Sequence, residues 1–328
     1  HFSYFPDPSY IICTFRLQKA LIRRSTFQSN HERSSPFHFL CSAICCHTGG
    51  LFCRRRIDLN LVTGFGADKT MTAVLSGEAD IGFMGAEATI YAYAEGARDS
   101  VVNFAQLTQR AGNFWWPEKR ILIFLAGSKR QKVLGGRKGG MPEMVFEYIL
   151  KKNNLDPKTD LSIDQSIDFG STAAAFSGGQ GDYTVEFEPS ATALEQEGSG
   201  YVVASLGVDS GYVPYTAYCA KSSYLEESVQ IIQGFTNALQ KGMNYVRSHT
   251  PSEIAQVIKP QFDDIDIETL TTIVNRYQEQ DTWKDSLIFE EDSFDLLTDI
   301  LKNAGELKED VPYHQLVTTD FAKNAMKP

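Results

Sequence analysis

From Ile57 onward, the order of apolar and polar residues is typical of an α/β protein. Ile57–Val62 alternates with the period of two expected for a strand, and the apolar run Asp80–Met84 predicts a buried strand. Ala67–Leu75 lies between them and has the spacing of a short helix, and a second helix is predicted over Glu87–Ala94. The segment therefore alternates between strand and helix.

The same alternation continues along the chain, and the last third is mainly helical. Pro142 suits the first turn of a helix over Pro142–Lys151, because an N–H at that position has no partner within the helix. Alternating strands and helices favour parallel sheets joined by right-handed crossovers. Further strands are predicted at Val101–Leu107, Asp164–Phe169, Tyr183–Phe187, Tyr201–Leu206 and Tyr215–Ala220, and further helices from Gly170 through Phe176 and at Val229–Ser248, Ser252–Ile258, Ile267–Gln280 and Ser293–Asn303.

A turn precedes several of these helices. The N–H groups at a helix start are unpaired and carry a partial positive charge, and small residues let a ligand approach them. In open α/β sheets such turns gather at the carboxyl ends of the strands, where they would hold a small anionic or strongly polar ligand. One such turn is common in α/β proteins, so the prediction depends on the set. The turns are Gly64–Lys69, Gly85–Ala88, Gly136–Pro142, Gly170–Ala173 and, with Glu-Pro in place of glycine, Glu186–Ala191.

Length and charge limit the classes of protein to consider. A chain of 328 residues with 42% apolar residues is typical of a globular protein with two domains. It has no run of about eighteen apolar residues, so no membrane-spanning segment is predicted. The net charge of −10 makes nucleic acid an unfavourable partner, because phosphate binding needs a basic surface.

The sequence does not match known catalytic or metal-binding motifs. Ser171 is not part of a G-x-S-x-G motif, and Gly135–Gly140 lacks the Gly-Lys-Ser/Thr ending of a phosphate-binding loop. His249 and His314 lie in polar contexts, which favour solvated or structural roles over that of a general base. We therefore expect no catalytic residue, no cofactor and no metal site, and the protein is not expected to be an enzyme.

Four stretches resemble the solute-binding proteins of the nitrate/sulfonate/taurine and thiamine-pyrimidine importers of the ABC type. The resemblance covers about residues 57–114 and 133–328, and its specificity comes from the order of the motifs. The motifs are Gly64-Phe65-Gly66-Ala67-Asp68-Lys69 followed by Leu75–Gly82, then Asn103–Arg110, Gly135–Glu143 and Phe187-Glu188-Pro189.

This resemblance implies an α/β, two-lobed fold of the periplasmic-binding-protein type II. Each lobe would contain a mainly parallel sheet flanked by helices, and two hinge strands, near Asn103–Phe114 and Tyr212–Lys221, would join the lobes. Lobe I would comprise residues 57–112 and 213–328, and lobe II residues 113–212. By position, the implied ligand contacts are Gly64, Gly66, Ala67, Gly85, Glu87 and Ala88 in lobe I, and Arg137, Gly139, Gly140, Met141, Gly170, Ser171, Thr172, Glu186 and Glu188 in lobe II.

The function implied is the binding of a small polar solute in a cleft between the lobes and its delivery to an ABC permease. The protein would act as a monomer outside the cytoplasmic membrane, in the periplasm or as a lipid-anchored lipoprotein. The alternative is an enzyme on the same fold, such as a menaquinone-pathway lyase or the fungal pyrimidine synthase, although Cys41–Cys46 does not reproduce the synthase's cysteine-rich motif. A sensing domain of a larger receptor is a third option.

The class of ligand stays open between a sulfonate, nitrate, a pyrimidine and a similar heterocycle. An anion would be expected to meet the helix N-termini and Arg137. Glu186 and Glu188 project to the same face of a strand, near Asp182, and would favour a cationic or hydrogen-bonding heterocycle if they face the ligand. An acid–base cluster, a cation site and a solvated rim are all possible roles of these carboxylates. Nearby aromatic residues favour a planar ring; they are Tyr183, Phe187, Tyr212 and Tyr215.

Residues 1–56 differ in composition from the rest of the chain. They are basic and contain five of the six cysteines, and Cys41-x3-Cys45-Cys46 lacks the paired spacing of a zinc site. Codons can be chosen for Phe52–Arg56 so that a shift by one base encodes Phe-Ala-Glu-Glu-Gly, which resembles the family pattern. Similar shifts convert Phe39–Cys46, Trp115–Leu122 and Gly127–Lys132 into family-like sequence. We therefore predict that residues 1–56 and 115–132 are frameshifted.

The predicted frameshifts have structural consequences. Lobe I would lack its first strand and part of its ligand-binding loop, and the apolar stretch Ile121–Ala126 would pair as a substitute strand in lobe II. Ligand binding by this chain is expected to be weak or absent for that reason.

Overall fold

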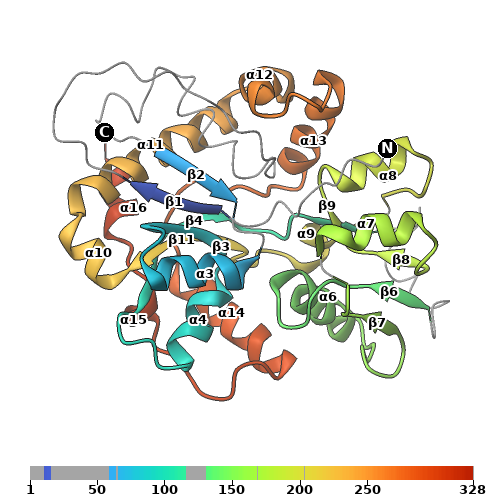
Figure 1. The fold of residues 1–328 in the computed structure, drawn as a ribbon, viewed down its shortest axis with the longest axis horizontal. Helices are drawn as coiled ribbons and strands as arrows, with labels where there is room; N and C mark the ends of the chain where they lie inside the picture. The colour runs from blue at the N-terminus through green and yellow to red at the C-terminus, as the bar shows by residue number, and fades with distance from the viewer. Residues whose placement is uncertain are drawn as a thin grey trace.

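The computed structural model describes residues 11–15, 59–63, 66–115, 131–167, 169–202 and 204–327. Most of the two segments predicted to be frameshifted, including Ile121–Ala126, lies outside the described residues, as does Gly64. Figure 1 shows two lobes, a larger one around a five-stranded sheet and a smaller one around two three-stranded sheets. The two-lobed α/β architecture predicted from the sequence is confirmed.

The larger lobe is built on a sheet with the strand order β2-β1-β3-β11-β4. All four neighbouring pairs in this sheet are antiparallel. Its strands are β1 (Ile11–Phe15), β2 (Leu59–Thr63), β3 (Ile81–Gly85), β4 (Val101–Thr108) and β11 (Thr216–Lys221).

The smaller lobe contains one parallel and one antiparallel sheet. Strand β6 (Lys132–Leu134) lies parallel to both β7 (Ser162–Asp164) and β8 (Tyr183–Thr184). The second sheet has the antiparallel order β10-β5-β9. It consists of β5 (Asn113–Trp115), β9 (Glu186–Phe187) and β10 (Ala204–Ser205).

The predicted strand Tyr183–Phe187 links these two small sheets. Its first part is β8 and its last part is β9, and between them the N–H of Val185 donates to the carbonyl oxygen of Leu134 at 3.0 Å. The combined order β7-β6-β8/β9-β5-β10 therefore has the same form as that of the larger sheet. In both, the strand in fourth place follows a connection from the other lobe.

The expectation of a mainly parallel sheet in each lobe is correct only for the β6, β7 and β8 sheet. Strands β5 and β11 each follow a connection from the other lobe, and both enter their sheets antiparallel to their neighbours. We expected the larger lobe to lack its first strand. In the structure, however, a strand lies between β2 and β3. Ile11–Phe15 occupies that position, and its β-branched and aromatic residues suit a paired strand.

Helices flank the sheets, and eight of them were predicted with bounds within two residues of those observed. Two predicted strands are wrong in part, because Phe169 begins a helix and Leu206 begins another. No helix among the described residues is both long and apolar enough to span a bilayer. The helices are α3 (Ala67–Ser76), α4 (Glu87–Ala94), α6 (Met141–Lys152), α7 (Phe169–Ser177), α8 (Ser190–Gln196), α9 (Leu206–Ser210), α10 (Ser222–Glu227), α11 (Val229–Ser248), α12 (Pro251–Ile258), α13 (Ile267–Glu279), α14 (Glu291–Ala304), α15 (Tyr313–Leu316) and α16 (Asp320–Ala325). The eight with the predicted bounds are α3, α4, α6, α7, α11, α12, α13 and α14.

Two connections, residues 109–112 and 206–215, join the lobes and lie side by side. The N–H of Val213 donates to the carbonyl oxygen of Gln109 at 2.9 Å. A third segment adds to this crossing, because Trp283 pairs with Thr108 and its ring lies 5.8 Å from that of Tyr277. The predicted lobe boundaries at 112/113 and 212/213 fall within these two connections and remain a proposal.

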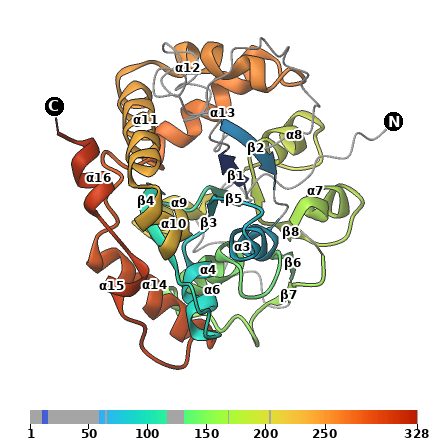
Figure 2. The ribbon, with the colours of Figure 1, turned by 60° about the vertical axis from the view of Figure 1, so that its left-hand side comes forward.

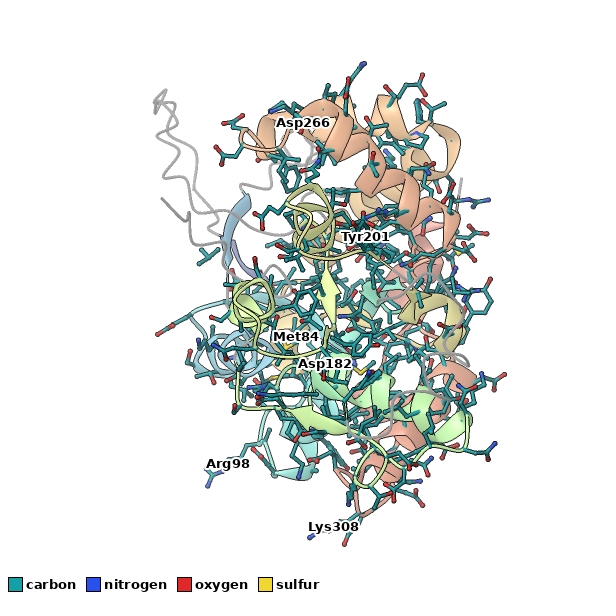
Figure 3. The ribbon with its side chains drawn as sticks, turned by 90° about the vertical axis from the view of Figure 1, so that its right-hand side faces the viewer. Met84, Arg98, Asp182, Tyr201, Asp266 and Lys308 are labelled. Atoms are coloured by element: carbon teal, nitrogen blue, oxygen red, sulfur yellow. The ribbon has the colours of Figure 1, made fainter. Side chains whose placement is uncertain are left out.

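The buried apolar core continues from one lobe into the other. Met84 of β3 is 1% exposed and lies in the interior, whereas Arg98 and Lys308 lie at the periphery (Figure 3). The free thiol of Cys219 is also buried beneath α3 and α4, which raises its pKa to about 12. The helix starts of the larger lobe are therefore carried on a packed and rigid sheet.

Candidate functional site

The first turns of α3 and α4 lie beside the loop that leads into α6. Figure 2 shows these three helices next to one another. Gly66 precedes α3 with a φ of 142°, in a region that favours glycine. A Cβ at this position would lie 2.5 Å from Oδ1 of Asp68, but this half-exposed side chain can move, so the turn needs glycine mainly for its conformation. Ala67, the first residue of the helix, is buried.

Direct contacts join the two lobes at this place. The guanidinium of Arg137 pairs with Asp68 at 3.0 Å, and both side chains are about half exposed. The hydroxyl of Tyr91 donates to the carbonyl oxygen of Gly139 at 3.0 Å. Lys138 lies 3.7 Å from Glu306. The structure therefore brings the predicted loop Arg137–Met141 of the smaller lobe against the larger lobe.

Glu87 lies in the first turn of α4 at this contact between the lobes. Its side chain is 1% exposed, and its Oε2 has no hydrogen-bond partner among the described residues. Burial raises its pKa to about 7, although hydrogen bonding from the N–H groups of Glu87 and Met141 and the charge of Arg137 favour the ionised form. Gly85 provides the space for this carboxyl, because a Cβ there would lie 2.1 Å from Oε2.

Glu143 is a second buried carboxyl that the sequence did not single out. Its oxygens accept hydrogen bonds from the N–H of Gly139 at 3.2 Å and from Nε2 of Gln165 at 2.6 Å. Burial and the nearby Glu147 raise its pKa to about 8. An acidic residue in the first turn of a helix that follows Gly140 was the signal that could have identified it.

Glu188, a predicted ligand contact, has partners within the protein for both carboxylate oxygens. It is fully buried, and its two oxygens accept hydrogen bonds from Arg276 at 2.7 Å and from the N–H of Thr192 at 2.9 Å. Arg276 also pairs with Glu195, so the ion pairs join α13 to α8. Arg276 supplies the counter-charge of Glu188 in this structure, and the ligand contact of Glu188 stays a prediction.

The other predicted residues of the smaller lobe lie on separate elements. Glu186 is buried in β9 and accepts a hydrogen bond from the hydroxyl of Thr184 at 2.6 Å. Gly170, Ser171 and Thr172 lie in the first turn of α7, which packs against α8 and β8. The described contacts do not join these residues to the Glu87 carboxyl, and their role as ligand contacts stays a prediction.

Two aromatic residues near the connections between the lobes, Tyr212 and Tyr215, make contacts within the protein. The Tyr212 ring lies 4.2 Å from the Arg110 guanidinium, and its hydroxyl donates to Asp281 at 2.7 Å. The hydroxyl of Tyr215 donates to Oδ1 of Asn113 at 2.7 Å, whereas Nδ2 of this buried amide has no partner in the described part of the chain. Sequence reasoning missed Asn113, because an asparagine in a short strand carries no recognisable motif.

The described residues contain no group of three or more His, Cys, Asp or Glu side chains that could hold a metal ion. The arrangement offers backbone N–H groups, buried carboxyls and an amide, all of which suit hydrogen bonding to a small polar molecule.

Solved structures with the same fold include several components of ABC importers. A ligand-binding component of an ABC-type import system from Staphylococcus aureus, with zinc bound, superposes with a TM-score of 0.70 at 16% identity, over 87% of this chain and 95% of that chain. The alkanesulfonate-binding protein SsuA from Xanthomonas axonopodis pv. citri, bound to MOPS, gives a TM-score of 0.65 at 15% identity, over 85% and 94%. These similarities show the periplasmic-binding-protein fold.

Sequence comparison gives the family. The chain is 41% identical to YtlA of Bacillus subtilis (strain 168), whose name describes it as a binding protein, over 275 residues that cover 84% of this chain and 82% of YtlA. The match to the family described as NMT1/THI5 like runs from residue 43 to residue 254, and so includes part of the first segment predicted to be frameshifted and all of the second. The chain therefore belongs to the NMT1/THI5-like family.

Proposed function

We propose that this protein binds a small polar solute between its two lobes and delivers it to an ABC importer. The observation that carries the proposal is the contact of helix starts from both lobes at one place, where Tyr91 donates to Gly139 and Arg137 pairs with Asp68. Closure of two lobes around a solute requires contacts of this kind, which exist in the closed state and are lost on opening.

The comparisons support the same function. The relative YtlA has the name of a binding protein, and structures of similar fold are components of ABC import systems. Family and relatives therefore favour a binding protein over an enzyme. The partner would be an ABC permease, and the protein would act as a monomer outside the cytoplasmic membrane, in the periplasm or held by a lipid anchor.

A thermal-shift screen tests this proposal. The panel consists of alkanesulfonates, nitrate, pyrimidines and flavins, applied to this chain and to a frame-corrected chain. Saturable stabilisation by one class, followed by a stoichiometry of one in calorimetry, is the expected result. Turnover of the solute during the measurement would contradict the proposal and favour an enzyme.

A further inference from the structure

The contact between the lobes places a carboxyl of the protein itself at two helix N-termini. Glu87 lies in the first turn of α4, and its carboxyl receives hydrogen bonding from its own N–H and from the N–H of Met141, the first residue of α6. The N-terminus of a helix stabilises negative charge through these N–H groups and through the helix dipole. The position that an anionic solute would take here is therefore occupied by a side chain.

The start of α8, in the smaller lobe, also lies next to a carboxylate of the chain. The Glu188 carboxylate accepts a hydrogen bond from the N–H of Thr192 in α8 and pairs with Arg276. Arg137, the only basic residue in the predicted set of ligand contacts, pairs with Asp68. Arg137 and three of the five predicted helix starts, those of α4, α6 and α8, thus lie next to carboxylates of the chain.

The surroundings of Glu87 are acidic. Tyr91, one turn later on α4, has its pKa raised by burial and then by the charges of Glu87, Glu306 and Glu143, and only Arg137 acts in the opposite direction. These carboxylates come from α4, from α6 and from the segment after α14, while Asp68 on α3 offsets Arg137. At a pH above the pKa values of about 7 for Glu87 and about 8 for Glu143, where both carboxyls are ionised, an added anion would be repelled here and a cation or an N–H donor attracted.

Glu87 also has an acceptor that the protein leaves unused. Its Oε2 is buried and has no partner among the described residues, and such an acceptor destabilises the protein unless another molecule satisfies it. Met141 and Arg137 reach this carboxyl from the smaller lobe, so separation of the lobes would uncover it.

We propose that the solute is a cation or a neutral nitrogen compound that donates an N–H hydrogen bond to Oε2 of Glu87, and that simple inorganic anions and alkanesulfonates are excluded. This inference rests on the proposed function and specifies its ligand class. The geometry that carries it is one buried, unpartnered carboxyl oxygen placed where the N-termini of α4 and α6 meet.

Calorimetry with named probes tests the ligand class. The nitrogen probes are putrescine, agmatine and cytosine, and the anionic probes are nitrate, sulfate and ethanesulfonate, each applied to the full chain and to its frame-corrected form. We expect binding of at least one nitrogen probe and of no anion. The variant Glu87→Gln should weaken this binding by about tenfold or more, because an amide lacks the charge that attracts the donor. Glu78→Gln, at an exposed position of the same lobe, should leave it unchanged.

A second measurement needs no ligand. The pKa of Glu87 is about 7 in the folded protein and 4.5 in its reference state, so the folded state binds the proton more tightly. The contribution of this proton to stability is complete below pH 4.5 and is lost as the pH rises through 7. The variant Glu87→Gln should therefore melt close to the parent at pH 4.5 and at a higher temperature than the parent at pH 8.

The possible outcomes separate this inference from the function on which it rests. Saturable binding of nitrate, sulfate or ethanesulfonate to the parent chain would overturn the inference and leave solute binding intact. A nitrogen probe that binds Glu87→Gln as tightly as the parent would also overturn it, as would equal melting temperatures at pH 8. Absence of binding by every probe to both forms of the chain would count against the proposed function as well.

Discussion

At the scale of single residues, two glutamates of the predicted site have opposite surroundings. Glu188 is fully buried and has a partner for each oxygen, including the charged Arg276. Glu87 is equally buried, but its Oε2 has no partner in the described chain. Sequence alone could not separate them, because Arg276 is 88 positions away from Glu188 and the pairing depends on the packing of α13 against α8.

Because Glu188 is buried with Arg276 as its counter-charge, we predict that this ion pair contributes to the stability of the fold. Replacement Arg276→Met leaves the Glu188 carboxylate buried without its counter-charge and should lower the free energy of unfolding by about 3 kcal/mol. Urea denaturation measures the change. The additional replacement Glu188→Gln should restore part of the loss.

An exposed ion pair provides the control for this experiment. Arg247 pairs with Asp285, whose side chain is 74% exposed, so Arg247→Met should cost less than about 1 kcal/mol. Equal losses in the Arg276 and Arg247 variants would show that burial does not set the strength of these pairs.

At the scale of elements, the turn between β3 and α4 holds the Glu87 carboxyl in place. A Cβ on Gly85 would lie 2.1 Å from Oε2 of Glu87, so Gly85→Ala requires this side chain to move. We expect the variant to lose affinity for the solute, with a stability loss of about 1–3 kcal/mol from overpacking. In the control Gly178→Ala, the nearest atoms to the new Cβ lie at 3.3 and 3.4 Å. Unchanged affinity in the Gly85 variant would argue against a role of this turn in binding.

The sequence predicts elements well where periodicity is strong and local. Helix Val229–Ser248 has the predicted bounds, because its apolar spacing is contained in the segment itself. Helix Glu87–Ala94 also has the predicted bounds, although its apolar residues are not confined to one face. Tyr183–Phe187 is extended as predicted, yet it divides between two sheets, since alternation does not specify which strands pair. The predicted strand Asp164–Phe169 is wrong except at Asp164, because β7 is Ser162–Asp164 and Phe169 begins α7.

The candidate site was only partly accessible to the same reasoning. Glycine turns led us to propose Gly85 and the loop Arg137–Met141, because a helix start needs space and a suitable φ. The roles of Glu143 and Asn113 depend on burial and on partners distant in the sequence, such as Gln165 and Tyr215. Neither burial nor a distant partner can be predicted from a short segment of the sequence.

At the scale of the whole molecule, the contacts between lobes set the balance between closed and open states. The Tyr91 hydroxyl crosses between the lobes to Gly139, so Tyr91→Phe should favour the open state. Loss of about 1 kcal/mol corresponds to roughly a fivefold lower affinity, together with a larger radius of gyration in small-angle scattering. Tyr93→Phe is the matched control, because that hydroxyl bonds Gln315 within the larger lobe. An unchanged radius would contradict this role for Tyr91.

The predicted frameshifts lead to a second expectation at this scale. A chain with residues 1–56 and 115–132 restored to the alternative frame should bind the solute more tightly than the present chain, because the missing part of the predicted ligand-binding loop would be available. Isothermal calorimetry on both chains measures the difference. Equal affinities would mean that these segments do not contribute to binding.

Trp283 lies where three segments cross between the lobes, so its fluorescence can be used to follow movement of the lobes. This indole is 7% exposed and lies against Tyr277, next to a connection between the lobes. The chain has three tryptophans, and the other two, Trp115 and Trp116, can be replaced by phenylalanine. The emission of the remaining indole would then follow solute capture and release in real time, without an attached dye.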